Sequence, residues 1–257
     1  MIIALVVVAA LALAIAAVFL YKRSKVASII DDEAAWDVRD SLARVPKYPH
    51  DTFKAEDGTD ITFTYYGHAS ISISTHGKHI YVDPVGDSVD WAGEPKADLV
   101  LITHTHYDHL DTAAVETLAG APDAYVRMAP GECSEPFDDV KVEAVPAYNI
   151  SPDQLAFHPK ERGDAGYVIT AGGKRIYVSG DTEDNEDVLA IRDIDFAFIC
   201  CNKPYTMTVE QCVRVVKSIR PKVFIPYHYG GTDIPTDIES LQESLKDVTE
   251  VLIRPLE

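Results

Sequence analysis

The stretch His104-Thr105-His106-Tyr107-Asp108-His109 places three imidazoles and one carboxylate in a single short turn. Neutral imidazole nitrogens and carboxylate oxygens are ligands of cations such as Zn²⁺, and the His-x-His spacing lets two rings on an extended backbone converge on one ion. Asp108 and His109 would then face a second ion about 3.5 to 4 Å from the first. The alternative is a solvated histidine-rich loop, but a polar turn rarely takes half of its residues from histidine. The stretch therefore predicts a metal centre.

The residues on either side of this stretch predict a strand followed by a helix. Ala97–Thr103 (ADLVLIT) is a short apolar run rich in β-branched residues, which is typical of a strand buried on both faces. Asp111–Leu118 (DTAAVETL) begins with an N-cap candidate and continues with apolar residues at helical spacing. Open α/β sheets bind ligands at the carboxyl ends of their strands, which is where the histidines fall.

Further elements support an α/β layered fold. Three short runs separated by turns, at 62–66, 70–75 and 79–82, predict an antiparallel meander. Capping boxes at Thr208–Gln211 and Thr236–Glu239 predict the starts of two late helices. Strands first, and then strands alternating with helices, indicate two packed sheets with helices outside.

Four segments resemble, in the right order, the motifs of the metallo-β-lactamase superfamily. The His-x-His-x-Asp-His stretch matches its signature without a gap, and three apolar runs end in matching polar residues: KHIYVDPV with Asp83, RIYVSGDT with Asp181 and VFIPYHYG with His228. The resemblance extends from about Ile61 to the C-terminus. It implies an αββα four-layer sandwich at residues 60–257.

The resemblance also implies which residues bind metal. His104 and His106 would hold the first ion, and the second ion would be held by Asp108, His109 and His228. Asp181 would bridge the two ions, and Asp83 would support the ligand loop. Asp108 would in addition be catalytic, because it would orient the attacking hydroxide.

The third histidine of the first site is missing from its usual position. The superfamily supplies it from the end of a strand that corresponds here to Val140–Ala147, which runs into Tyr148 and Asn149. His158 is the one further histidine between His109 and Asp181, so it is the candidate by elimination. Asn149 remains an alternative through its amide oxygen, which is a poorer ligand for Zn²⁺ than imidazole.

Four short segments, GHASISI at Gly67, VPAYN, FHPK and SGDT, are most similar to simple hydrolases near the ascorbate-6-phosphate lactonase and N-acyl-phosphatidylethanolamine phospholipase D branches. This resemblance implies a hydrolase that uses a metal-bound hydroxide, with two Zn²⁺ ions expected and Mn²⁺ or Fe²⁺ as alternatives. We expect a small phosphodiester as substrate, with a lactone or ester as runner-up. Two other classes stay open, a mono-iron oxidoreductase of the sulfur dioxygenase type and a non-catalytic metal-binding protein.

The N-terminal residues predict a membrane anchor. Ile2–Leu20 (IIALVVVAALALAIAAVFL) contains no charged residue and is long enough to cross a bilayer as one helix. Lys22, Arg23 and Lys25 follow it, so the positive-inside rule places the downstream domain in the cytoplasm of a single-pass protein of the cell membrane. A cleaved signal peptide is the minority alternative. We therefore expect an anchor with its basic flank at residues 1–25, a linker at 26–59 and the hydrolase domain after it.

The charge balance restricts the possible substrates. Forty-one acidic residues against twenty-three basic ones give a formal net charge of −18. An acidic surface repels the phosphates of nucleic acids, so a nucleic-acid substrate is not expected. We expect a small-molecule or lipid-like substrate instead. The sequence does not predict an oligomeric state.

Overall fold

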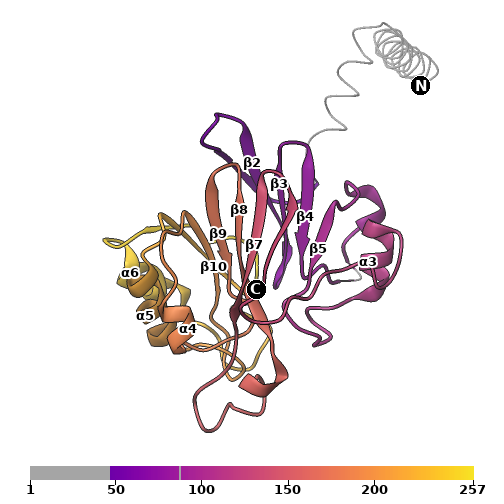
Figure 1. Cartoon of the computed structure of the whole chain (residues 1–257). Coiled ribbons are helices and arrows are strands. Elements are labelled where there is room, and N and C mark those ends of the chain that lie inside the picture. The colour runs from indigo at the N-terminus through magenta and orange to yellow at the C-terminus, as the bar shows by residue number, and fades with distance from the viewer. Residues whose placement is uncertain (1–46, 87) are drawn as a thin grey trace, which may run out of the picture. The chain divides into compact units, whose positions relative to one another are not determined.

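Two β-sheets pack face to face between helices in the computed structural model, which describes residues 47–86 and 88–257 (Figure 1). The first sheet has the strand order β1-β2-β3-β4-β5, and only its β4–β5 pair is parallel. Its strands are β1 (His50–Lys54), β2 (Asp60–Gly67), β3 (Ser70–Thr75), β4 (Lys78–Val82) and β5 (Leu99–Leu101).

The second sheet has the order β12-β11-β10-β9-β8-β7-β6. The strands from β9 to β12 are parallel, and those from β6 to β9 are antiparallel. Its strands are β6 (Cys133–Phe137), β7 (Val140–Pro146), β8 (Ala165–Ala171), β9 (Lys174–Val178), β10 (Phe196–Cys200), β11 (Val223–Tyr227) and β12 (Glu250–Val251).

The helices lie on the outer faces of the two sheets. α3 (Thr112–Ala119) packs beside β5 and the 3₁₀ turn η1 (Trp91–Gly93), whereas the helices beside the second sheet are α4 (Glu186–Leu189), α5 (Val209–Ile219) and α6 (Ile238–Leu245) (Figure 1). A further 3₁₀ turn, η2 (Lys160–Arg162), precedes β8. This arrangement confirms the predicted metallo-β-lactamase-type α/β fold.

Aromatic side chains join the two sheets. The ring of Phe63 on β2 lies 5.0 Å from that of Phe196 and 5.3 Å from that of Phe198, both on β10 (distances between centroids). All three side chains are buried. Such edge-on and tilted pairs add about 0.5–1.5 kcal/mol each to the free energy gained by burial. These contacts therefore pack β2 of the first sheet against β10 of the second.

The cap residues agree with the predictions in two helices and differ in the third. Asp111 caps α3 by accepting hydrogen bonds from the backbone of Ala113 and Ala114. Thr208 and Gln211 form the predicted capping box of α5.

At α6 the cap is Asp237, whereas Thr236 donates its hydroxyl to the carbonyl of Cys201. The second predicted capping box was therefore wrong by one residue, because Thr236 has a tertiary partner.

The domain begins earlier than the sequence predicted. The compact unit starts at Tyr48, and β1 pairs in full register with β2, so part of the predicted 26–59 linker belongs to the first sheet. The strand was missed because it is a half-exposed edge strand whose mostly polar sequence directly follows Pro49. Residues 1–46, with the predicted anchor and most of the linker, lie outside the described residues. Within residues 47–86 and 88–257, every helix is too short or too polar to cross a bilayer.

Candidate metal centre

The predicted site residues gather where strands of both sheets end. His104 follows β5, Asp181 follows β9 and His228 follows β11. The backbone of His228 has φ of 48°, in the left-handed region, so the chain turns sharply as the strand ends. Residues far apart in the sequence therefore meet at one edge of the sandwich.

The first group of possible ligands consists of His104, His106 and His158. One ring nitrogen of each lies within 4.8 Å of the other two. His104 Nε2 is 3.1 Å from His106 Nδ1. His104 and His158 are buried, and His106 is half-buried. The structure thus brings the three histidines that the sequence assigned to the first ion into one cluster.

The second group consists of Asp108, His109 and His228, joined by His68. Asp108 Oδ2 lies 3.6 Å from His228 Nε2 and 3.3 Å from His68 Nε2. The rings of His68 and His228 have centroids 3.8 Å apart. His68 was absent from the predicted site. Its position directly after Gly67, at the end of a strand, was the one signal that the sequence offered.

Asp181 lies between the two groups. Its Oδ2 is 3.3 Å from His158 Nε2 and 4.0 Å from His104 Nε2, which belong to the first group. Its Oδ1 is 3.3 Å from His109 Nε2 and 3.6 Å from His228 Nε2, which belong to the second group. One carboxylate oxygen thus faces each group, which is the arrangement that a bridging ligand requires.

Buried polar atoms at the centre fit a cation. His109 Nε2, Asp181 Oδ1 and His228 Nε2 are buried and make no hydrogen bond with the part of the chain that the structure describes. Leaving buried polar atoms unpaired costs free energy, so such atoms usually have a ligand. Nitrogen and carboxylate donors in this combination suit Zn²⁺ and related divalent cations. The residues therefore fit the metal that the superfamily resemblance implies.

The protonation equilibria show how strongly these groups interact. Burial lowers the pKa of His104 well below its usual value. At His109 the neighbouring carboxylates Asp181 and Asp83 outweigh burial, and the pKa is raised well above its usual value. Burial opposes ionisation of Asp181, but the imidazoles of His228 and His109 outweigh it and hold the pKa well below its usual range. Asp181 is thus an ionised, buried carboxylate that depends on positive charge around it.

Asp83 supports the ligand loop from beneath. Its carboxylate accepts hydrogen bonds from the Thr103 backbone N–H (2.8 Å) and hydroxyl (2.6 Å). It also lies 2.8 Å from His109 Nδ1. A carboxylate on the outer ring nitrogen fixes the orientation and tautomer of a metal-binding histidine. The structure therefore places Asp83 where the resemblance implied.

Arg162 contacts the first group from outside, which the sequence did not predict. Its Nη1 lies 2.6 Å from His106 Nε2, and its Nη2 lies 2.8 Å from His158 Nδ1. Asp164 holds the guanidinium through Nε at 2.6 Å. Because arginine only donates, both outer ring nitrogens accept in this contact, so each ring proton lies on the inner nitrogen. Binding of a cation at the inner nitrogens would require these protons to move to the outer nitrogens and the guanidinium to move away. This contact left no signal in the sequence, because it depends on how η2 is oriented.

Asn149, the alternative first-site ligand, is held by its own loop. Its Nδ2 donates to the carbonyls of Gln154 (3.1 Å) and Tyr205 (2.8 Å), and its backbone N–H donates to the carbonyl of His158. Asn149 therefore supports the loop that carries His158.

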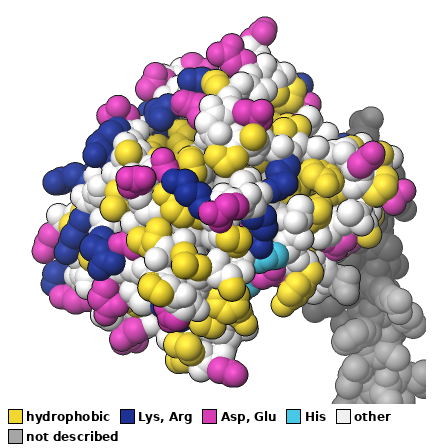
Figure 2. Space-filling view, turned by 60° about the horizontal axis from the view of Figure 1, so that its bottom comes forward, with side chains coloured by type: hydrophobic (Ala, Val, Ile, Leu, Met, Phe, Trp, Pro, Cys, Tyr) yellow, Lys and Arg dark blue, Asp and Glu magenta, His cyan; other side chains and the backbone are white. Residues whose placement is uncertain are grey.

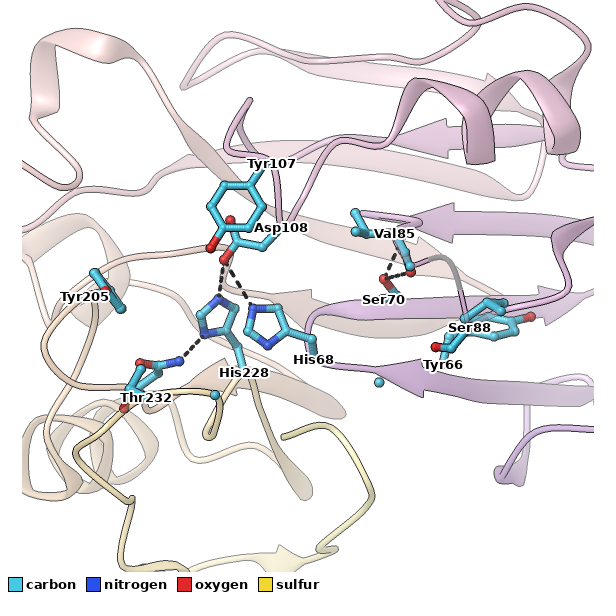
Figure 3. A pocket seen from close by; sticks show the side chains of 15 residues that line it. Tyr66, His68, Ser70, Val85, Ser88, Tyr107, Asp108, Tyr205, His228 and Thr232 are labelled. Atoms are coloured by element: carbon cyan, nitrogen blue, oxygen red, sulfur yellow. Dashed lines mark hydrogen bonds and ion pairs between the residues drawn. The ribbon is translucent and has the colours of Figure 1, made fainter.

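Two adjoining cavities give access to the centre. One of about 220 Å³ is lined by residues of both groups, including His106, Asp108 and His158. A second cavity, of about 430 Å³, extends from Asp108 and His228 toward Tyr66 and Ser88 (Figure 3). In Figure 3 the rings of His68 and His228 both point toward the Asp108 carboxylate. A substrate can therefore reach the centre from one side.

Comparisons with known proteins agree with the fold and the site. A family model described as "Beta-lactamase superfamily domain" matches residues 62–228. A UPF0173 metal-dependent hydrolase of Pelotomaculum thermopropionicum is 31% identical over 220 residues, which are 75% of this chain and 96% of that relative. A similarly named protein of Thermococcus onnurineus is 30% identical over 74% of this chain and 94% of its own.

A crystal structure from Parabacteroides distasonis, assigned as a metal-dependent hydrolase, has a TM-score of 0.75 and 37% identity with this chain. The match covers 82% of this chain and all of that one.

Proposed function

Because the chain belongs to the metallo-β-lactamase superfamily and is a metal-dependent hydrolase, we propose that it cleaves a small molecule at a centre holding two divalent cations. Asp181 carries this proposal, because its two oxygens face the two ligand groups separately. We assign His104, His106 and His158 to the first ion and Asp108, His109 and His228 to the second. Zn²⁺ suits these donors best, and Mn²⁺ or Fe²⁺ are the alternatives.

Divalent cations bound here would lower the pKa of water toward neutrality and polarise the scissile group, which are the two requirements of hydrolysis. The chain's own residues would hold the cations and orient the attacking water. Asp181 stays ionised between the groups, and the Asp108 carboxylate faces the cavity, where it can accept a proton from the attacking water. His68 and His228 restrict the orientation of that carboxylate.

The relatives named as metal-dependent hydrolases support hydrolysis over the oxidoreductase and the purely metal-binding alternatives. The centre itself could hydrolyse a phosphodiester or a carboxylic ester or lactone equally well, because each of these reactions needs an activated water and a polarised oxygen. The substrate must therefore be chosen by the cavity rather than by the ligands.

The test of this function combines metal analysis with turnover. The wild-type protein should contain about two cations per chain. His106→Ala should lose metal and hydrolytic activity together, because water replaces a missing imidazole poorly. His79→Ala is the control, since His79 lies on β4 and bonds Ser74 away from the centre. Full occupancy and full activity of His106→Ala would contradict the assignment.

We further propose that residues 2–20 anchor the domain to the cell membrane on its cytoplasmic side. The support is the uncharged apolar run followed by Lys22, Arg23 and Lys25. The full-length chain should sediment with membranes, whereas a chain that starts near Ala27 should be soluble and active. Recovery of the intact full-length protein in the soluble fraction would contradict this proposal.

A further inference from the structure

We propose that the substrate is an uncharged ester or lactone whose apolar group occupies the cavity of about 430 Å³ beside the centre. This inference rests on the proposed hydrolytic function and names its substrate class. It reverses the order expected from the sequence, in which a phosphodiester came first.

The cavity adjoins the position where the reaction would occur. Four residues line both this cavity and the smaller one at the ligand groups: Tyr107, Asp108, Tyr205 and His228. A molecule whose reacting carbonyl lies between the groups can therefore extend the rest of its length into the larger cavity. The volume lies within the usual range for small-molecule sites, about 300–1,000 Å³.

The wall of the cavity offers no positive charge to an anionic group. The described residues that line it include neither lysine nor arginine, and Asp108 contributes a carboxylate. An anionic tail held in the part of the cavity away from the ligand groups would lose its hydration without gaining a positively charged partner, which is unfavourable. The cations would compensate charge on the reacting group, but not charge carried deeper in the cavity.

Two polar groups in the wall are already satisfied by the protein, whereas the buried Oδ1 of Asn202 has no hydrogen-bond partner among the described residues. The hydroxyl of Ser70 donates to the Asp83 carbonyl and accepts from the Val85 backbone N–H. The Tyr66 hydroxyl donates to Glu94 at 2.7 Å. The Ser70 and Tyr66 hydroxyls therefore have little remaining capacity to bind a polar substrate, and Val85 and Val89 make part of the wall apolar.

Basic residues near the centre are also engaged. Arg162 is paired with Asp164 and lies against His106 and His158. Lys203 lies 3.6 Å from the buried carboxylate of Glu183. Neither residue lines either of the two adjoining cavities.

Large apolar side chains surround the entrance. Tyr107 is 89% exposed and Tyr205 is 40% exposed, and both border the two cavities. Ile234, 52% exposed, lies with Tyr205 along a neighbouring hollow. Figure 2 shows hydrophobic side chains beside the histidines on this face. Exposed apolar groups concentrated around a cavity favour binding of an apolar ligand.

The reaction balances without any further reactant. The oxygen of water forms a bond to the carbonyl carbon, the bond from that carbon to the alkoxy oxygen breaks, and the alkoxy oxygen receives a proton. The products are a carboxylic acid and an alcohol, which remain one molecule when the substrate is a lactone.

The test uses two esters that differ in one charge, with the full-length, metal-replete protein. Para-nitrophenyl butyrate and para-nitrophenyl hemisuccinate share a leaving group and acyl length, but the second carries a carboxylate. After correction for their hydroxide-catalysed rates, kcat/KM for the butyrate should exceed that for the hemisuccinate by about tenfold or more. Equal corrected values would overturn the inference.

A charge placed on the cavity wall provides the matched control. Ser88 is exposed and lines the cavity, so substitution there should not disturb folding. Ser88→Lys should raise the relative kcat/KM for the hemisuccinate several-fold, whereas Ser88→Gln should leave the ratio unchanged. An identical ratio in both variants would contradict occupation of this cavity.

A third substrate distinguishes failure of the proposed substrate class from failure of the proposed hydrolytic function. Bis-para-nitrophenyl phosphate carries its charge at the reacting group. If it is cleaved rapidly and both esters are left intact, the substrate class is wrong and the hydrolytic function stands. If none of the three compounds is cleaved by metal-replete protein, the proposed function fails and the substrate class with it.

Discussion

Arg162 is the residue outside the ligand set on which the first group depends most directly. It holds His106 and His158 by their outer ring nitrogens. Arg162→Ala should raise the affinity for metal several-fold, because the guanidinium favours the ring tautomer whose proton lies on the nitrogen that a cation would bind. Arg162→Lys keeps a cationic donor, so its affinity for metal should lie between those of the wild type and Arg162→Ala. Competition with a chromophoric chelator measures the affinity.

The control is Arg192→Ala, because Arg192 bonds the carbonyls of Leu189 and Ile191 at the end of α4. Its affinity for metal should equal that of the wild type. Unchanged or lower affinity in Arg162→Ala would contradict this effect of the guanidinium on the ring tautomers.

His158 and Asn149 can be distinguished by the number of cations retained. His158→Ala should weaken one cation far more than the other, because His158 Nε2 lies on the side of Asp181 that faces the first group. Asn149→Ala removes two hydrogen bonds from the loop, so it should lower stability by about 1–3 kcal/mol while both cations still bind at saturating metal. The number of cations per chain, measured by mass spectrometry for each variant, decides which of the two residues is the ligand. Loss of one cation in Asn149→Ala and retention of both in His158→Ala would reverse the assignment.

At the scale of elements, α5 connects the second sheet to the loop that follows Asp181. Thr208 caps the helix, and the Gln211 side chain donates to Glu183 (3.1 Å) and Asp184 (2.9 Å). Thr208→Ala should lower the free energy of unfolding by about 1 kcal/mol, because one backbone N–H loses its partner. Thr208→Ser keeps the hydroxyl and should remain close to wild type. Chemical denaturation measures both, and equal stability of the two variants would exclude a capping contribution.

The elements also show which features the sequence could predict. Apolar runs ending in Asp83, Asp181 and His228 predicted strands with polar residues at one edge, because strand burial and strand ends both leave local signals. The contacts of Arg162 and His68 could not be predicted, because they depend on the orientation of a short 3₁₀ turn and on a left-handed residue at a strand end. β1 was missed because it alternates between exposed and half-buried residues and has no fully buried one.

At the scale of the whole domain, one ion pair joins the first strand to the C-terminal segment. Arg254 bonds the Asp51 carboxylate through Nε at 2.5 Å and Nη2 at 2.8 Å, and the Tyr65 hydroxyl donates to the same carboxylate. The hydrogen bond from Arg254 is the largest influence on the pKa of Asp51, which is lowered from its usual value. The pair therefore stabilises the domain when Asp51 is ionised.

This pair predicts a pH-dependent stability difference. Because the folded pKa of Asp51 is depressed, its contribution is present above the unfolded pKa, about 3.9, and is lost as the pH falls through the folded pKa. Asp51→Asn should lower the free energy of unfolding by about 1 kcal/mol at pH 7, and the difference should narrow below about pH 4. Asp60→Asn, at the exposed pair with Lys54, is the control with a smaller effect. A difference that stays constant from pH 7 to pH 3 would contradict this account.

The central claim is that the two ligand groups and Asp181 form one hydrolytic metal centre. The most direct measurement is a titration of chelator-treated, metal-free protein with Zn²⁺ while hydrolysis of para-nitrophenyl butyrate is followed. The rate should rise from the uncatalysed value and level off at about two equivalents, whereas Asp181→Ala should stay at the uncatalysed value throughout. Full activity in the metal-free wild type, or an unchanged titration curve in Asp181→Ala, would contradict the claim.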